Sequence, residues 1–254
     1  MLVDTHFHLS NEDYDNIDLV IKEAIDNKVT TLIMSGCDKK SIIEGLEYIK
    51  EYDNLYMTVG FHPEEVDNIS DKDLTWLEEI IINNKKIVGI GEIGLDYYYT
   101  KDNKDLQIKL FRNQLDIAKR LNLPVVIHSR DAFLDTYNTL KEYNVVGVIH
   151  CFTSNIENAR KFIELGFKLG IGGVVTFKNS KLGEVIKNIN LKNIVLETDS
   201  PYLSPEPFRG KKNGPKNVLI VAKKIAELKE INIDEVMHVT TKNVYGLFDL
   251  DKVI

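Results

Sequence analysis

The sequence of 254 residues predicts an α/β fold, a (β/α)8 or TIM barrel, from three observations. Short apolar runs alternate with helical patterns along the whole chain, as in a parallel sheet covered by helices. The runs are apolar almost throughout, as strands buried on both faces require. Five of the six histidines stand where these runs end. We expect residues 1–254 to form one domain, with a doubly wound open sheet as the alternative architecture.

The strands are predicted where Val, Ile and Leu gather in short runs between helical segments. Pro124 precedes the fifth run, at the first position of a strand, where proline is tolerated. The eight predicted strands are residues 2–5, 29–34, 55–59, 87–90, 125–127, 145–149, 167–171 and 194–196.

The helices are predicted where apolar residues recur three or four positions apart. The first such segment carries Ile17, Val20, Ile21, Ala24 and Ile25 on one face. The predicted helices are residues 15–28, 41–52, 71–83, 103–121, 132–143, 156–165, 182–189, 218–230 and 233–248.

The composition limits the classes of partner. With 32 basic and 39 acidic residues the net charge is −7, which argues against a broad basic surface for nucleic acid. It permits a nucleic acid held by a metal centre and a few local cations. No apolar run is long enough to span a membrane. The early His6 leaves no room for a signal peptide, and Cys37 and Cys151 form no disulfide framework, so we expect a cytoplasmic protein.

Ligand-type side chains gather at the predicted strand ends, which is where barrel enzymes carry their chemistry. His6 and His8 are two positions apart and therefore point the same way from an extended chain. The other members are His62, Glu92, His128, His150 and Asp199. Without His62, the group contains four imidazoles and two carboxylates. These six ligands are more than one four-coordinate zinc requires. They predict two divalent ions (Zn, Mn, Mg, Co or Ni) about 3.5–4 Å apart with a shared carboxylate.

Several stretches of the sequence resemble the TatD family of metal-dependent deoxyribonucleases. They are VDTHFH (residues 3–8), GEIGLDYY (91–98), PVVIHSR (124–130) and ETDSPYL (197–203). The segment from Pro205 through Arg209 to Pro215 is similar to the family's region after the last strand. The motifs follow the family's order over residues 3–215.

The resemblance implies a barrel hydrolase of the amidohydrolase type. It implies that His6, His8 and Asp199 hold one metal, that His128 and His150 hold the other, and that Glu92 bridges them. His62 would line the site and contact the scissile phosphate. The sequence departs from the family at Ser10, where Asp or Asn is usual, and at Glu64, where many relatives carry His.

Each of these residues also has a structural interpretation. Asp199 could form a turn before Pro201, and as a functional group it would bind metal and accept the proton of the attacking water. Glu92 could form a buried ion pair. His128 and His150 could be core histidines, and His62 could order the turn before Pro63.

Two arginines are candidate phosphate contacts. Arg209, with Lys211 and Lys212, lies in a loop after the eighth strand, where barrels often build phosphate sites. That loop could equally be a solvated basic segment. Arg130 could bind phosphate or pair with Asp131 or Asp135.

Tyr97, Tyr98 and Tyr99 follow Glu92 and could stack on unpaired bases or simply pack the loop. We expect Cys151 to point away from a ligating His150 and to pack in the core. His238 lies in a predicted helix without an obvious partner.

The leading hypothesis is a two-metal phosphodiesterase, a 3′-to-5′ exonuclease on single-stranded or frayed DNA, with catalytic roles for Asp199, Glu92 and His62. We expect a monomer with no membrane partner. The same centre could hydrolyse an amide, ester or lactone, including the acyl group of an aminoacyl-tRNA. A metal-storing or scaffold barrel is the non-enzymatic alternative.

Overall fold

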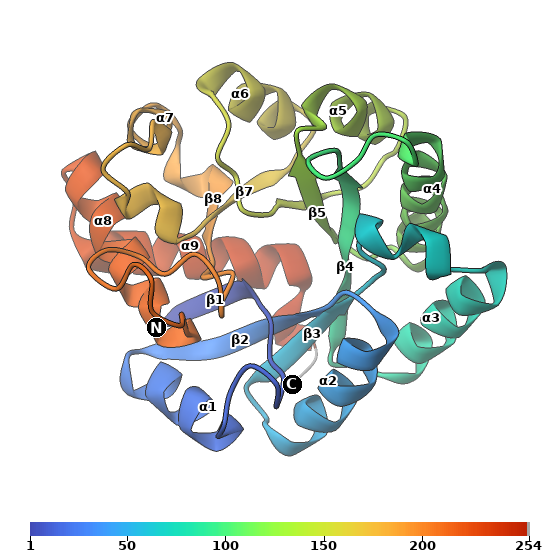
Figure 1. The fold of residues 1–254 in the computed structure, drawn as a ribbon. Helices are drawn as coiled ribbons and strands as arrows, with labels where there is room; N and C mark the ends of the chain where they lie inside the picture. Colours follow the sequence, from blue (N-terminus) through green and yellow to red (C-terminus); the bar gives the residue numbers. More distant parts are fainter. Residues whose placement is uncertain (253–254) are drawn as a thin grey trace.

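The computed structural model describes residues 1–252 and confirms the predicted barrel (Figure 1). Eight strands form one parallel sheet in the order of the chain. They are β1 (Leu2–Phe7), β2 (Val29–Gly36), β3 (Leu55–Val59), β4 (Ile87–Asp96), β5 (Val125–Arg130), β6 (Gly147–Ile149), β7 (Lys168–Ile171) and β8 (Ile194–Leu196). Beyond β8 the chain joins β1, because the Asp199 N–H donates to the His6 carbonyl at 2.9 Å and the His8 N–H to the Ser200 carbonyl at 2.7 Å.

Helices surround the sheet (Figure 1). They are α1 (Ile17–Asp26), α2 (Lys39–Glu51), α3 (Asp71–Asn83), α4 (Lys104–Leu121), α5 (Phe133–Lys141), α6 (Ile156–Glu164), α7 (Leu182–Asn188), α8 (Val218–Lys229) and α9 (Ile233–Phe248), with short 3-10 turns at η1 (Pro63–Asn68), η2 (Gly173–Thr176), η3 (Leu191–Asn193), η4 (Pro215–Asn217) and η5 (Leu250–Lys252). None of the helices in the described residues combines the length and apolarity needed to cross a membrane.

Capping side chains shift two helix starts from the predicted positions. The Asn16 side chain accepts a hydrogen bond from the Leu19 N–H at 2.9 Å, so α1 begins at Ile17 rather than at residue 15. Asp38 accepts from the Ser41 N–H at 2.8 Å, so α2 begins at Lys39 rather than at residue 41.

Four strands, β1, β2, β4 and β5, extend further than predicted, and the extensions of β4 and β5 shape the site. β4 continues to Asp96 and β5 to Arg130, because the two strands pair beyond their apolar runs, with Gly94 opposite His128. At Gly94 a Cβ atom would lie 2.0 Å from the His128 carbonyl oxygen, so the pairing needs glycine there. Glu92 and His128 therefore lie within strands rather than after them.

The N-terminal end of the barrel is filled by apolar side chains. Val244 and Phe248 of α9 and Leu250 of η5 pack against a layer from seven strands. The layer consists of Val3, Ile33, Tyr56, Val88, Val126, Val148 and Val195. Because this end is closed, polar groups that line the barrel interior are accessible only from the C-terminal end.

Candidate metal centre

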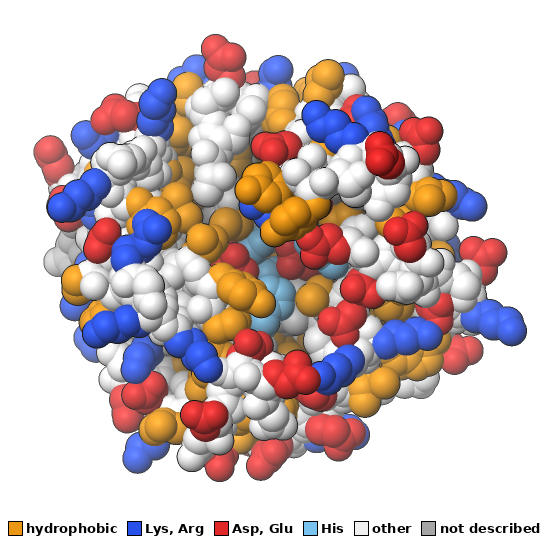
Figure 2. Space-filling model, in the orientation of Figure 1, with side chains coloured by type: hydrophobic (Ala, Val, Ile, Leu, Met, Phe, Trp, Pro, Cys, Tyr) orange, Lys and Arg blue, Asp and Glu red, His pale blue; other side chains and the backbone are white. Residues whose placement is uncertain are grey.

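A cleft of about 460 Å³ opens at the C-terminal end of the strands, and we call it the metal cleft. Histidine side chains lie at the bottom of this hollow (Figure 2). The cleft is lined by His8, Cys37, His62, Glu64, Glu92, Asp96, Tyr99, His128, Arg130, His150, Asp199 and Tyr202. His6 lies beneath it with its side chain 1% exposed. The barrel thus brings together the six residues expected to bind metal, together with His62.

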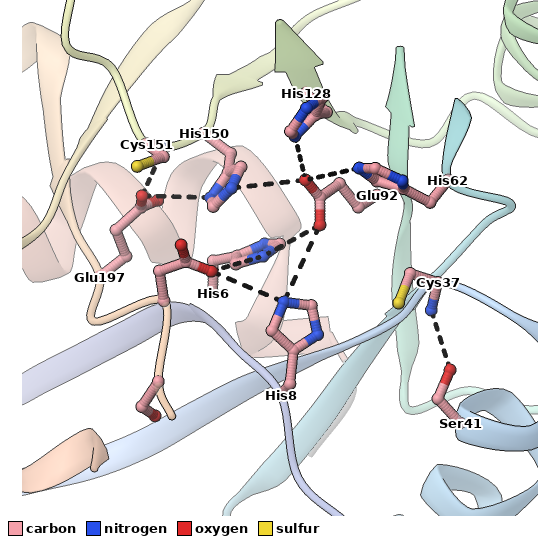
Figure 3. A network of polar contacts seen from close by, with 12 residues as sticks. His6, His8, Cys37, Ser41, His62, Glu92, His128, His150, Cys151 and Glu197 are labelled. Atoms are coloured by element: carbon pink, nitrogen blue, oxygen red, sulfur yellow. Dashed lines mark hydrogen bonds and ion pairs between the residues drawn. The ribbon is translucent and has the colours of Figure 1, made fainter. Parts of the chain in front are cut away.

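Glu92 stands at the centre of this group (Figure 3). Its Oε2 atom is 3.4 Å from His6 Nε2 and 4.0 Å from His8 Nε2. Its Oε1 atom is 2.6 Å from His128 Nδ1 and 3.4 Å from His150 Nε2. The two oxygens therefore face two separate groups. These are the β1/β8 half (His6, His8 and Asp199) and the β5/β6 half (His128 and His150).

Asp199 completes the β1/β8 half. Its Oδ1 atom is 3.6 Å from His8 Nε2 and 3.8 Å from His6 Nε2. The buried Asp4 fixes the preceding residue, since its carboxylate accepts from the Thr198 N–H at 3.0 Å and from the Thr198 hydroxyl at 2.6 Å. The side chain of Asp199 thus points at the histidines of β1.

Two further carboxylates support the β5/β6 half, and the sequence did not reveal their roles. Asp96 Oδ2 lies 2.8 Å from His128 Nε2, and Glu197 Oε1 lies 3.2 Å from His150 Nδ1. Glu197 fits because β7 carries Gly170 beside it, where a Cβ atom would lie 2.1 Å from Glu197 Oε2. Both carboxylates belong to the motifs given above. The glycine at position 170 was the available sign in the sequence that a side chain from a neighbouring strand passes close to β7.

The β5/β6 half holds protons strongly in the absence of metal. Burial opposes protonation of His128, but hydrogen bonds to Asp96 and Glu92 outweigh it and raise its pKa to about 9. Burial likewise opposes protonation of His150, whose pKa the charges of Glu92 and Glu197 raise to about 10.

The β1/β8 half is less uniform. Burial, together with repulsion from His150, lowers the pKa of His6. Burial acts in the same direction on His8, but its hydrogen bond to Asp199 raises the pKa well above the ordinary value. The pKa values of Glu92 and Asp199 are lowered, because nearby histidines outweigh the burial of both carboxylates.

His62 lies over the β5/β6 half. Its Nε2 atom is 3.8 Å from Glu92 Oε1, and its ring packs edge-on against His128 with centroids 4.5 Å apart. Its Nδ1 atom accepts a hydrogen bond from the Glu64 N–H at 3.3 Å, which orders the start of η1. Burial lowers the pKa of His62 to about 4, so its imidazole is neutral at pH 7. His62 therefore both orders the turn and lines the metal cleft.

The two candidate phosphate arginines lie in different places. Arg130 lines the metal cleft and stacks on Tyr98, with its Cζ atom 3.6 Å from the ring centroid. Asp135, one of its expected partners, pairs instead with Lys104 at 2.7 Å. Arg209 stacks on Phe177 at 3.7 Å and is not part of the metal cleft.

Lys212 and Lys211 accompany Arg209 in the loop after β8. Lys212 donates to the Asp13 carbonyl, and the Lys211 ammonium lies 5.9 Å from the Phe208 ring centroid. These contacts order the loop around Arg209.

The three consecutive tyrosines differ in exposure. Tyr97 is buried and packs the loop, whereas Tyr98 and Tyr99 are 56% and 70% exposed at the cleft rim. Cys151 corrects an expectation, because it is not a core residue. The chain leaves β6 at Ile149, residue 151 takes a left-handed φ of 45°, and the partly exposed Cys151 is one of the residues that line a cavity.

The donor set fits divalent metal. Four overlapping triads of ligand atoms lie within 4.8 Å of one another, drawn from the six expected residues with His62 and Asp96. Both ring nitrogens of His6 are buried, with no hydrogen-bond partner among the described residues. A buried polar atom without a partner is costly, and coordination to a cation would satisfy it. Imidazole with carboxylate suits Zn, Mn, Co and Ni, and carboxylate suits Mg.

The barrel and the cluster of histidines and carboxylates at its mouth define a metal-dependent hydrolase, and comparisons with known proteins agree. The family model described as TatD related DNase matches residues 3–249. The chain therefore belongs to the TatD family, as its motifs indicated.

Its relatives include bacterial proteins of equal length. The chain is 44% identical over 256 residues to the uncharacterized metal-dependent hydrolase YabD of Bacillus subtilis, covering 99% of this chain and 100% of YabD. The uncharacterized metal-dependent hydrolase YcfH of Escherichia coli is 37% identical, covering 98% and 96%. The crystal structure of YjjV, a TatD homologue from Escherichia coli K12, matches with a TM-score of 0.90 and 30% identity over 98% of both chains.

Proposed function

We propose that residues 1–254 form a single deoxyribonuclease domain that removes nucleotides from the 3′ end of single-stranded or frayed DNA. The observation that carries the proposal is the arrangement around Glu92, whose two oxygens face the β1/β8 half and the β5/β6 half. A carboxylate shared between two ligand groups is typical of two-metal phosphodiester hydrolysis. Membership of a family described as TatD related DNase supports DNA as the substrate.

Two divalent ions are part of the proposal. His6, His8 and Asp199 would hold one and His128 and His150 the other, with Glu92 between them. Bound ions would lower the pKa of water and neutralise charge on the phosphate. One chain supplies all of these residues, so the proposal is a monomer, and the two free thiols support a reducing, cytoplasmic location.

The side chains of the cleft have separate tasks in the proposed reaction. Asp199, ionised at neutral pH and 14% exposed to the cleft, accepts the proton of the attacking water. The neutral His62 binds a phosphate oxygen through its Nε2–H, since Nδ1 is occupied by the Glu64 N–H. Arg130 offsets the negative charge of the scissile phosphate. Arg209, outside the metal cleft, would contact a more distant phosphate.

The experiment uses a 5′-labelled single-stranded oligonucleotide and protein that has been stripped with chelator and reloaded with single metals. We expect a ladder that shortens from the 3′ end, that requires metal, and that is lost in His128→Ala. The matched control is His238→Ala, which alters the exposed sixth histidine on α9. Immediate release of labelled mononucleotide would instead indicate digestion from the 5′ end.

A parallel assay with p-nitrophenyl esters tests the alternative chemistry. A phosphodiesterase should leave these esters intact. Hydrolysis of the esters by protein that holds metal but does not cleave DNA would contradict the proposal and favour the ester or amide hydrolase.

A further inference from the structure

A second cleft, of about 590 Å³, lies beside the metal cleft. It is formed by the residues that follow β5 and β6, where α5 and α6 begin side by side (Figure 1), and we call it the α5–α6 cleft. Its volume falls within the range of about 300–1,000 Å³ that is typical of ligand sites. The metal chemistry described above makes no use of it.

The two clefts adjoin each other. Arg130 and His150 line both, so each side chain stands at the boundary between them. His150 belongs to the β5/β6 half of the metal centre, 3.4 Å from Glu92. Arg130 is held there by its stack on Tyr98. A molecule bound at the metals can therefore extend into the α5–α6 cleft by passing Arg130.

The lining of the α5–α6 cleft suits a flat heterocycle with polar edges. The half-buried Phe133 supplies aromatic surface, and it packs edge-on against the buried Phe162 with centroids 5.3 Å apart. Phe152 is a further buried apolar side chain of the lining. Leu134 is 64% exposed at the cleft, an apolar contact left open to water. Exposed polar groups, among them Asp131 and Thr153, are placed to bind donors and acceptors on a base edge.

We propose that the α5–α6 cleft is a nucleotide subsite, which receives the unpaired base next to the scissile phosphate while Arg130 binds the phosphate between the two clefts. The proposal rests on the proposed nuclease function and names its substrate more closely. A base in this cleft has its pairing edge among protein groups, so it must be unpaired. The smallest efficient substrate then carries one unpaired nucleotide beyond the phosphate that is cleaved.

The test fills the cleft without altering the metal ligands. Thr153 is exposed, and Thr153→Trp places a large side chain in the cleft. The matched control is Thr75→Trp, on an exposed residue of α3 that lines neither cleft. A second variant, Phe133→Leu, removes an aromatic ring and keeps apolar volume. Each protein is assayed on a short thymidine oligonucleotide and on bis(p-nitrophenyl) phosphate, a diester without a base.

Stacking on an aromatic side chain typically tightens the binding of a base roughly tenfold or more. We therefore expect Thr153→Trp and Phe133→Leu to lower kcat/KM for the oligonucleotide about tenfold relative to the small diester, with that ratio unchanged in Thr75→Trp. A non-cleavable oligonucleotide with 2-aminopurine next to its terminal phosphate reports binding directly. Its fluorescence should be quenched by the wild type and less by Phe133→Leu.

The outcomes separate the two proposals. The subsite would be overturned if the two variants lost kcat/KM equally on both substrates, or on neither, and if Phe133→Leu quenched 2-aminopurine as strongly as the wild type. The proposed nuclease function would remain in that case. A wild-type protein that hydrolyses neither the oligonucleotide nor the diester would overturn the proposed function and the subsite with it.

Discussion

Buried carboxylates stand behind both histidines of the β5/β6 half, Asp96 at 2.8 Å and Glu197 at 3.2 Å. In the described part of the chain, both ring nitrogens of His6 lack a hydrogen-bond partner, and His8 has the Cys37 thiol rather than a second carboxylate beside it. A hydrogen bond to Asp96 orients His128 and an ion pair with Glu197 orients His150, as partners behind metal-ligating histidines commonly do. For His6 and His8, the two-residue spacing across the end of β1 and close packing set the direction.

The comparison shows two ways to place an imidazole at a strand end. A histidine that is alone on its strand needs a partner from a neighbouring strand to fix its ring. His6 lies within β1 and His8 directly follows the strand, so the two reach the same carboxylates from neighbouring positions of one backbone segment. The predictions below act on this difference.

The largest effect is expected from Glu92→Gln, because Glu92 faces both halves. Loss of the shared charge removes several kcal/mol of transition-state stabilisation, so activity on DNA should fall about 10³-fold. Elemental analysis should show reduced metal in the variant. Glu79→Gln, on an exposed residue of α3, is the control. Full metal content with normal activity would refute the central role of Glu92.

Metal affinity should rise steeply with pH, and more steeply for the β5/β6 half. Two protons held with pKa values of about 9 and 10 must leave before its histidines can coordinate metal. Each released proton contributes about tenfold in affinity per pH unit, as long as the pH lies below the pKa of that histidine in the metal-free protein, about 9 or 10. Calorimetry in buffers of different ionisation enthalpy measures the release, and an affinity independent of pH between 7 and 9 would contradict it.

The stability of the metal-free protein should fall as pH rises, the opposite of the expected trend in metal affinity. The raised pKa values of His128 and His150 mean that protonation stabilises the folded state fully below about pH 6.5. That stabilisation is lost as pH rises through about 9 and 10. Thermal unfolding of chelated protein should therefore give a lower Tm at pH 10 than at pH 7.

Removal of the supporting carboxylates distinguishes the halves directly. Asp96→Asn and Glu197→Gln should each lower activity or metal affinity about 10–100-fold. The protein should lose the ion of the β5/β6 half and keep the other, because Asp96 and Glu197 contact the histidines of that half. Asp116→Asn, on an exposed residue of α4, is the control. Equal loss of both ions would mean that the two halves bind metal as one unit.

His62→Gln should act on turnover without emptying either half. One charge-assisted hydrogen bond to phosphate contributes about 1.5–3 kcal/mol, so kcat should fall about 10- to 150-fold. Metal content should match the wild type. A variant that loses metal would place His62 among the ligands instead.

The smallest effects are expected from the arginines. Exposed ionic contacts contribute up to about 1 kcal/mol, so Arg130→Ala should lower kcat/KM on DNA about fivefold. Arg209→Ala should have almost no effect on a dinucleotide and a few-fold effect on longer strands at low salt. An equal effect on both lengths would place Arg209 at the scissile phosphate.

The sequence predicted the barrel because each buried strand is an apolar run and each run is followed by an amphipathic helix. It missed the full lengths of β4 and β5, since the pairing around Gly94 depends on the neighbouring strand. It also missed the roles of Asp96 and Glu197, whose partners lie on other strands. The wrong placement of Cys151 has a local cause, because a left-handed residue breaks the alternation of side chains.

The first strand completes its pairing only with the end of the last. His6 and His8 bond to Asp199 and Ser200, and Asp4 holds Thr198 across 194 positions of sequence. At a synthesis rate of about 5–20 residues per second, β1 waits roughly 10–40 s for this partner. A chain still being translated therefore carries no assembled hydrolytic centre until residue 199 has left the ribosome.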